Sequence, residues 1–139
     1  MTRLTRALRG QVPANTTERI ICDDGVFTDG WVVTDFRVFT TSIATGDDTE
    51  GLLAIDEDGC TGAFDASDSR QIGWSFFFIG ANGGAVNSFI APNHVVVRDL
   101  FVENFSGVPM NYVIDIERRT LTDDQAILAL IQERSQDDL

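Results

Sequence analysis

The sequence predicts a mainly β protein, an antiparallel β-sandwich or jelly roll that ends in one α-helix. From about residue 18 to residue 118, short runs rich in Val, Ile, Phe and Thr alternate with Gly, Asp, Asn and Ser, a pattern typical of strands joined by turns. No helical pattern separates these runs, which favours packed antiparallel sheets over a parallel α/β fold. After Arg119 the apolar spacing changes to that of a helix. One domain is expected, because 139 residues lie close to the commonest domain size.

The N-terminal segment, residues 1–16, is predicted to be a basic arm outside the sandwich. Arg3, Arg6 and Arg9 recur at every third position. The arm could dock on an acidic neighbouring copy, which makes these arginines candidate interface residues; deleting residues 1–10 would then weaken assembly and leave the fold intact. The alternative is a frayed terminus with solubilising charges. No apolar core follows the arginines, so the segment is not read as a secretory signal; the protein is expected to be made in the cytosol and either to stay there or to leave inside an assembled particle.

Residues 17–119 are expected to form the sandwich. The last strand alternates clearly, with Tyr112, Ile114 and Ile116 on one face and acidic residues on the other. Asn82-Gly83-Gly84 lies between two apolar runs and predicts a hairpin. Strands are expected over residues 18–22, 31–42, 51–55, 71–79, 85–90, 95–104 and 110–118.

The strand at residues 71–79 is apolar on both faces. This pattern indicates either a central strand covered twice or a strand whose outer face meets a neighbouring subunit. Trp74, Phe76 and Phe78 are therefore candidate subunit-interface residues.

Residues 120–139 are expected to form a helix, near residues 123–135, and a tail. Thr122 and Gln125 fit a capping box, in which each side chain satisfies a backbone donor of the other residue. The apolar stripe that follows would pack on this subunit's sandwich or on a neighbour's, and its candidate interface residues are Ile127, Leu130 and Ile131.

The charge composition indicates adaptation to concentrated salt. All ten basic residues are Arg, 16 of the 22 acidic residues are Asp, and the net charge is −12. At about 1 M salt the Debye length falls to roughly 3 Å, so dense surface carboxylates no longer repel one another strongly. This composition resembles that of haloarchaeal proteins and of the viruses of haloarchaea. The same charge disfavours direct nucleic-acid binding, and no apolar run approaches the ~20 residues of a membrane span.

The residues do not predict an enzyme or a resident cofactor. His94 is the one histidine, which excludes a multi-histidine metal site within one subunit. Cys22 and Cys60 are too few for a zinc site, and the sequence leaves open whether they pair. Oxygen ligands for a hard cation could come from Asp47, Asp48 and Glu50, or from Asp56 and Asp58, although neither loop has EF-hand spacing. Diffuse cation binding on an acidic surface is the simpler interpretation.

The C-terminal third resembles small virion proteins of marine and haloarchaeal viruses. The matching segments are HVVVRDLFVEN at residues 94–104, MNYVIDIER at residues 110–118, and the helix that ends in Ser135-Gln136-Asp137. The resemblance implies a structural component of the virion, a capsid coat or decoration protein that contacts its own copies and other virion proteins. It implies no catalytic residue.

Two other functions fit the same sequence. A tail tube, a head–tail adaptor or a vertex protein would place the subunit elsewhere in the particle. A cellular ligand- or sugar-binding sandwich would use Trp31, Trp74 and Tyr112 as an aromatic platform in a cleft. A large assembly in molar salt would favour a virion protein, and a monomer or dimer would favour the binding module.

Overall fold

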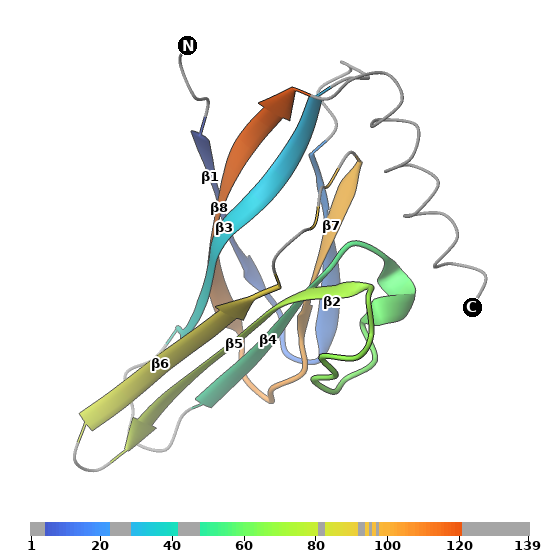
Figure 1. Ribbon diagram of the computed structural model, residues 1–139. Coiled ribbons are helices and arrows are strands. Elements are labelled where there is room, and N and C mark those ends of the chain that lie inside the picture. The colour runs from blue at the N-terminus through green and yellow to red at the C-terminus, as the bar shows by residue number, and fades with distance from the viewer. Residues whose placement is uncertain are drawn as a thin grey trace.

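The computed structural model describes residues 5–22, 29–41, 48–80, 83–91, 94, 96 and 98–120. These residues form two antiparallel sheets in a sandwich-like arrangement (Figure 1), so the predicted mainly β, antiparallel fold is confirmed. The helix expected near residues 123–135, with Ile127, Leu130 and Ile131, lies outside the described residues. The three-stranded sheet has the order β1 (Thr5–Val12), β8 (Met110–Thr120), β3 (Asp29–Thr40). The five-stranded sheet has the order β2 (Thr16–Ile21), β7 (Asp99–Asn104), β4 (Asp48–Ala54), β5 (Gln71–Gly80), β6 (Gly83–Ile90).

The core lies between the two sheets and follows the period-2 alternation of the strands. On β8 the predicted inward row, Tyr112, Ile114 and Ile116, is buried. The register places this row between the inward residues of β1 and those of β3. A bulge between Val33 and Asp35 shifts the phase of β3, so that both halves of this long strand face the core. The second sheet contributes Leu53, Ile72, Leu100 and Val102 to the same cluster.

The N-terminal residues belong to the sandwich. In place of a free arm, Thr5–Val12 pairs along its whole length with β8 as strand β1. The arginine spacing suggested a period of three, but the apolar residues follow a period of two. Leu8 and Val12 face the core opposite Ile114 and Met110. Gly10 lies under the Tyr112 ring, where a Cβ would come within 2.6 Å of the phenol oxygen.

The edge of β3 is capped by polar groups from other parts of the chain. Trp31 and Val96 exchange backbone hydrogen bonds of 2.8 Å. The Val33 amide donates to His94 Nε2 at 2.9 Å, and the Val38 amide donates to Ser75 Oγ at 3.2 Å. The expected strand at residues 95–104 is therefore divided, since Val96 bridges to β3 whereas β7 begins only at Asp99.

A buried side chain ties together the two turns at one end of the sandwich. The Asn104 amide donates to the carbonyls of Val12, Pro13 and Val108 at 2.8–3.2 Å. Its carbonyl oxygen accepts from the amide and the hydroxyl of Ser106. The β1–β2 connection is thereby fastened to the β7–β8 connection.

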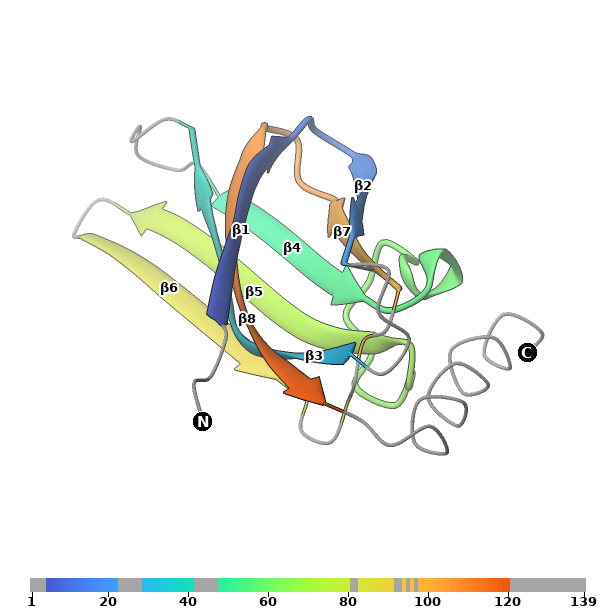
Figure 2. The same cartoon turned by 90° about the horizontal axis from the view of Figure 1, so that it is seen from above.

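The sheets approach closely over the middle of β4 and then diverge. A Cβ at Gly51 would lie only 2.7 Å from Val38 Cγ1, so glycine permits the contact between β4 and β3. Beyond this point β5 and β6 extend as a hairpin past the three-stranded sheet (Figures 1 and 2). This hairpin carries the candidate site.

Candidate functional site

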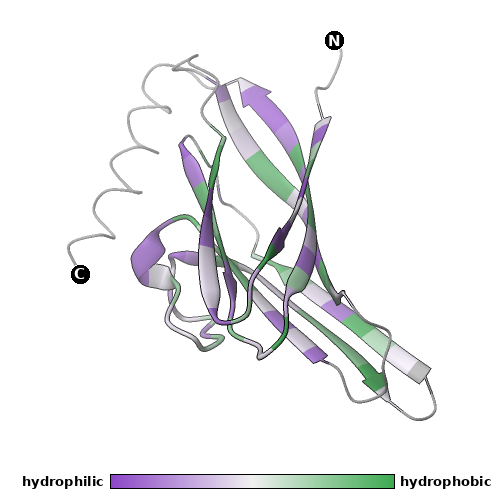
Figure 3. Cartoon of the chain, turned by 180° about the vertical axis from the view of Figure 1, so that it is seen from behind, coloured by the Kyte–Doolittle hydropathy of each residue, from purple (hydrophilic) through white to green (hydrophobic). Residues whose placement is uncertain are grey.

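The β5–β6 hairpin is the uncharged part of a strongly charged chain. From Gln71 to Val97 the sequence contains no Asp, Glu, Arg or Lys, although these residues make up 23% of the protein. Figure 3 shows hydrophobic residues continuing along β5 to the end of that strand. Exposed apolar residues on a projecting hairpin do not help the protein to stay soluble. Such residues commonly mark a surface that contacts another molecule.

The outer face of the hairpin carries a row of aromatic side chains. Gly51 and Ser75 pair with each other and both face β3, so the alternate positions Trp74, Phe76 and Phe78 face outward. Across β6, Trp74 is opposite Phe89. The exposed fractions are 48% for Phe78 and 62% for Phe89, while Trp74 and Phe76 are partly buried. The three predicted interface residues of β5 therefore share one outward face.

The connection between β4 and β5 covers the other half of this sheet face. It begins at the short 3-10 turn η1 (Glu57–Gly59). Phe64 packs edge-to-face on Phe105 with ring centroids 5.1 Å apart. The Gly62 amide donates to the Glu103 carboxylate at 2.8 Å. Leu52, on the outward face of β4, is fully buried. The loop thus supplies its own cover over β4 and β7, and leaves the β5–β6 half exposed.

A shallow apolar hollow lies where this loop meets the hairpin. It has a volume of about 430 Å³ and is lined by Phe64, Ala66, Trp74 and Phe89. The Trp74 indole is held in place, because its Nε1 donates to Gln71 Oε1 at 2.9 Å. Gln71 is itself buried and donates to the carbonyls of the loop.

The inner face of the hairpin is also partly exposed. Where the sheets diverge, an apolar groove of about 400 Å³ opens between the end of β3 and the hairpin. Phe39 and Val86 line it and are 41% and 48% exposed. The prediction that this strand is apolar on both faces is confirmed, and near its end neither face is fully covered by the described residues.

Glu50 is an acidic residue beside the aromatic row. Its register partner on β5 is Phe76. Burial raises the pKa of Glu50 to about 7, and a hydrogen bond and charge repulsion from Asp48 add to this effect. Below about pH 7 Glu50 therefore holds its proton, which removes one negative charge from the outer face. Asp47, predicted to join these residues in a cation site, lies outside the described residues.

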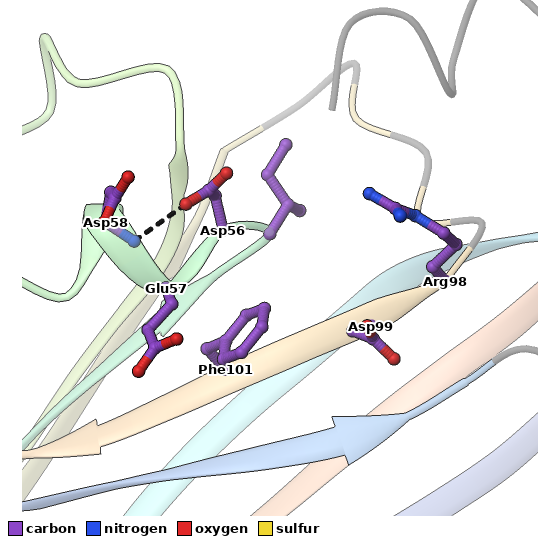
Figure 4. Close-up of a pocket in the computed structure, with 7 residues that line it drawn as sticks. Asp56, Glu57, Asp58, Arg98, Asp99 and Phe101 are labelled. Atoms are coloured by element: carbon purple, nitrogen blue, oxygen red, sulfur yellow. Dashed lines mark hydrogen bonds between the residues drawn. The ribbon is translucent and has the colours of Figure 1, made fainter. Parts of the chain in front are cut away.

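The second predicted cation loop has a structural role. Asp56 Oδ1 accepts from the Asp58 amide at 2.7 Å and so caps η1. The adjoining pocket, about 270 Å³, is lined by both carboxylates, but the side chains of Glu57 and Asp58 point to opposite sides of the turn (Figure 4). Asp99, also at this pocket, forms an ion pair with Arg19 at 2.8 Å. Among the residues that the structure describes, no three His, Cys, Asp or Glu side chains are grouped to hold a metal ion.

Two of the three predicted arm arginines lie on opposite faces of β1. Arg6 is in the inward row, and its guanidinium carbon lies 5.3 Å from the centre of the Trp31 ring. Arg9, three positions later, lies on the other face, and Arg3 is outside the described residues. The period-2 geometry of a strand separates residues that a helical turn would have brought together.

The proposed platform of Trp31, Trp74 and Tyr112 does not form. Trp31 and Tyr112 are 1% and 4% exposed and belong to the core, whereas Trp74 lies on the outer face. The Tyr112 hydroxyl donates to Glu18 at 3.3 Å, and burial together with Glu18 raises the pKa of Tyr112 to about 12. The aromatic neighbours of Trp74 are Phe64 and Phe89, neither of which was predicted as a site residue from the sequence. Centring the predicted hairpin on residues 81–82 would have placed Phe89 opposite Trp74.

Three further residues considered for chemistry, His94, Cys22 and Cys60, are parts of the scaffold. His94 Nδ1 donates to the Ala91 carbonyl at 2.7 Å while Nε2 accepts from Val33, so both ring nitrogens are in use. Cys22 is buried and Cys60 is partly buried, both as thiols. Burial and the nearby Glu103 raise the pKa of Cys60 to about 12, which makes this thiol a poor nucleophile.

No protein-family model, curated protein or solved structure matches this chain. None of the helices in the described ranges is long and apolar enough to cross a membrane.

Proposed function

We propose that this protein is a structural subunit of a virus particle adapted to high salt, and that it acts through contacts with its own copies and with other virion proteins. A capsid coat or decoration protein is the favoured position. The observation that carries the proposal is the uncharged β5–β6 hairpin with exposed apolar residues on both faces, in a chain of net charge −12.

An exposed apolar hairpin is unfavourable for a solitary molecule in water. Phe78, Val86 and Phe89 leave apolar surface exposed to water. Each Å² of such surface costs a free energy of roughly 25 cal/mol relative to the buried state. Burial of this surface against another subunit recovers that free energy. Association also requires two acidic molecules to approach, and concentrated salt screens their repulsion to a range of about 3 Å at 1 M. The acidic composition and the exposed apolar hairpin therefore both favour assembly of subunits in concentrated salt.

The virion assignment rests on the resemblance of residues 94–104 and 110–118 to small virion proteins, together with the salt-adapted composition. Tail tube, head–tail adaptor and vertex positions use the same kind of subunit contact. Incorporation of the labelled protein into particles, followed by localisation in the particle by electron microscopy, distinguishes these positions.

The self-association can be tested with matched surface variants. Light scattering of the wild-type protein in 3 M KCl is expected to give a molecular mass above that of the monomer. The double variant Phe78→Ser/Phe89→Ser should shift the mass towards the monomer. Ile21→Ser is the matched control, because Ile21 is 64% exposed but lies on β2, at the opposite edge of the same sheet. A wild-type protein that stays monomeric at every salt concentration and also fails to incorporate into particles would contradict the proposal.

A second candidate is ligand binding at the hollow of Phe64, Trp74 and Phe89. The held orientation of the Trp74 indole favours it, since a fixed aromatic surface is what stacks on an apolar ring face of a sugar or similar ligand. Tryptophan fluorescence would report such binding at Trp74, while buried Trp31 provides a constant background. Ligand binding would be favoured over the structural role if soluble oligosaccharides quench the fluorescence of a monomeric wild-type protein. The Trp74→Phe variant should then lose this quenching.

A further inference from the structure

β6 differs from the other strands at sheet edges in the described part of the chain. An edge strand presents unpaired N–H and C=O groups, and proteins commonly protect such edges with charges, bulges or covering segments. β1 carries Arg6 and Arg9, and β2 carries Glu18 and Arg19. β3 has a bulge, and three of its edge amides are bonded to Val96, His94 and Ser75. β6 has the sequence GGAVNSFI, with no charge and no proline.

The backbone of β6 is arranged to accept another strand. The Ala91 amide donates to the Ile72 carbonyl at 2.8 Å, and the register pairs Ile90 with Gly73. In an antiparallel pair the bonded and non-bonded positions alternate. The N–H and C=O groups of Gly84, Val86, Ser88 and Ile90 therefore point away from β5. Figure 2 shows β6 as the outermost strand of its sheet.

A second copy of the chain is the occupant that fits this edge. An antiparallel strand is complementary to itself across a twofold axis, so two identical edges can satisfy each other. A cationic partner would be attracted to the acidic remainder of the molecule and not to this neutral hairpin. Another copy, itself of charge −12, meets the least repulsion here.

The sequence of β6 also selects a register. Centring the twofold on Asn87 pairs all four outward-pointing residues, with Val86 of one copy opposite Ser88 of the other. On the outer face, Phe89 of one copy then lies opposite the small side chain of Ala85 of the other, and the two Asn87 side chains meet at the centre. Large–small pairing allows the aromatic rows of both sheets to continue across the junction.

We propose that two copies join by antiparallel pairing of β6 with β6, centred on Asn87, to form one continuous ten-stranded sheet. The inference rests on the proposed role as an assembling subunit and specifies the contact. Exposed Phe78 and Phe89 of both copies then lie on one shared face, available to further subunits.

A cysteine substitution tests the register directly. Cα atoms directly opposite each other at a non-hydrogen-bonded position are about 4.5 Å apart, within the range of a disulfide. Asn87→Cys is expected to give a covalent dimer under mild oxidation in 3 M KCl. Ala7→Cys on β1 and Ile21→Cys on β2, also exposed edge positions, should remain monomeric on denaturing gels, as should the wild-type protein.

A backbone variant tests the hydrogen bonding. Ser88→Pro removes an outward N–H without adding charge, and proline is tolerated at edges whose N–H faces solvent. The dissociation constant should rise at least about tenfold, since each dimer loses two central hydrogen bonds. Circular dichroism and the thermal transition of the diluted variant establish that the subunit is folded.

The outcomes separate the two proposals. If the wild-type protein associates but Asn87→Cys cross-links no more than the controls, β6 pairing is wrong and the structural role stands. If the wild-type protein is monomeric under all conditions, β6 pairing fails, and if it also does not incorporate into particles, the structural role fails with it. Cross-linking at Asn87 with weakened association of Ser88→Pro supports β6 pairing, and a wild-type mass above that of the dimer in 3 M KCl supports the structural role as well.

Discussion

His94 illustrates how a single side chain can connect distant parts of this fold. Its Nε2 accepts from the Val33 amide, which is always a donor, so the ring proton resides on Nδ1 and is donated to Ala91. Protonation of Nε2 would remove the acceptor for Val33. Burial lowers the pKa of His94 below 6.5, partly offset by the bond to the Ala91 carbonyl.

The His94 bonds should produce a pH-dependent contribution to stability. Because the pKa is lower in the folded than in the unfolded state, stability is present above pH 6.5 and is lost as the pH falls through the folded pKa. His94→Ala is expected to lower the free energy of unfolding by about 1–3 kcal/mol at pH 8. Urea titrations at constant salt should show a smaller difference from wild type at pH 5. An equal difference at both pH values would contradict the assigned tautomer.

Glu50 should show the opposite dependence. Its pKa is raised from 4.5 to about 7 in the folded state, so its contribution to stability is present below pH 4.5 and is lost as the pH rises through 7. Glu50→Gln is therefore expected to unfold at a higher temperature than wild type at pH 8, by a few degrees, and at a similar temperature at pH 4.5. Glu57→Gln, on the exposed turn η1, serves as a control for the loss of one negative charge. Stabilisation of Glu50→Gln that is independent of pH would contradict the raised pKa of Glu50.

At the scale of elements, β1 changes the interpretation of the N-terminus. The strand pairs with β8 from Thr5 to Val12, and Leu8 and Val12 pack in the core. Arg6 closes one end of that core over Trp31. An exposed cation–π contact contributes about 0.5–1 kcal/mol, whereas the strand as a whole covers one edge of β8.

Deletion of residues 1–10 should therefore damage the fold, contrary to the expectation for a docking arm. Removal of β1 exposes the edge of β8 and the apolar residues Ile114 and Ile116 to water. We expect the deletion variant to lose its cooperative thermal transition, as measured by calorimetry. The full-length double variant Arg6→Ala/Arg9→Ala removes the charges without the strand and should lose only about 1 kcal/mol. If the deletion variant folds normally and fails only in assembly, the docking-arm hypothesis would be supported instead.

At the scale of the whole molecule, the charge distribution determines the conditions for stability. Net charge −12 destabilises a compact state by self-repulsion unless salt screens it. Ion pairs with an exposed arginine, such as Arg37 with Asp35 at 2.7 Å and Arg19 with Asp99 at 2.8 Å, offset little of this repulsion.

The melting temperature should accordingly fall by several degrees or more when KCl is reduced from about 3 M to 0.1 M, at constant protein concentration. Replacing the salt with an equal osmolality of sucrose should recover only part of the loss, because a neutral solute does not screen carboxylates. Differential scanning calorimetry measures the effect. Unchanged melting across this range would contradict adaptation to salt.

Local periodicity was enough to predict the class of fold and much of the sandwich. The alternation of Tyr112, Ile114 and Ile116 identified the inward face of β8, and the doubly apolar run around Trp74 identified an unusual strand. Both signals depend on residues two positions apart in the chain, so they can be recognised in the sequence alone. The C-terminal helix and the virion role stay predictions.

Which aromatic residues are buried was decided only by tertiary structure. Trp31 and Trp74 both lie in apolar strands, yet one is in the core and the other on the outer face. The difference depends on what covers each side of each sheet, and the covering residues come from distant parts of the chain. The same is true of β1, whose membership of the sandwich requires pairing with β8 a hundred residues away. Such long-range pairing leaves almost no local signature, because its free energy arises from surfaces that meet only when the chain has folded.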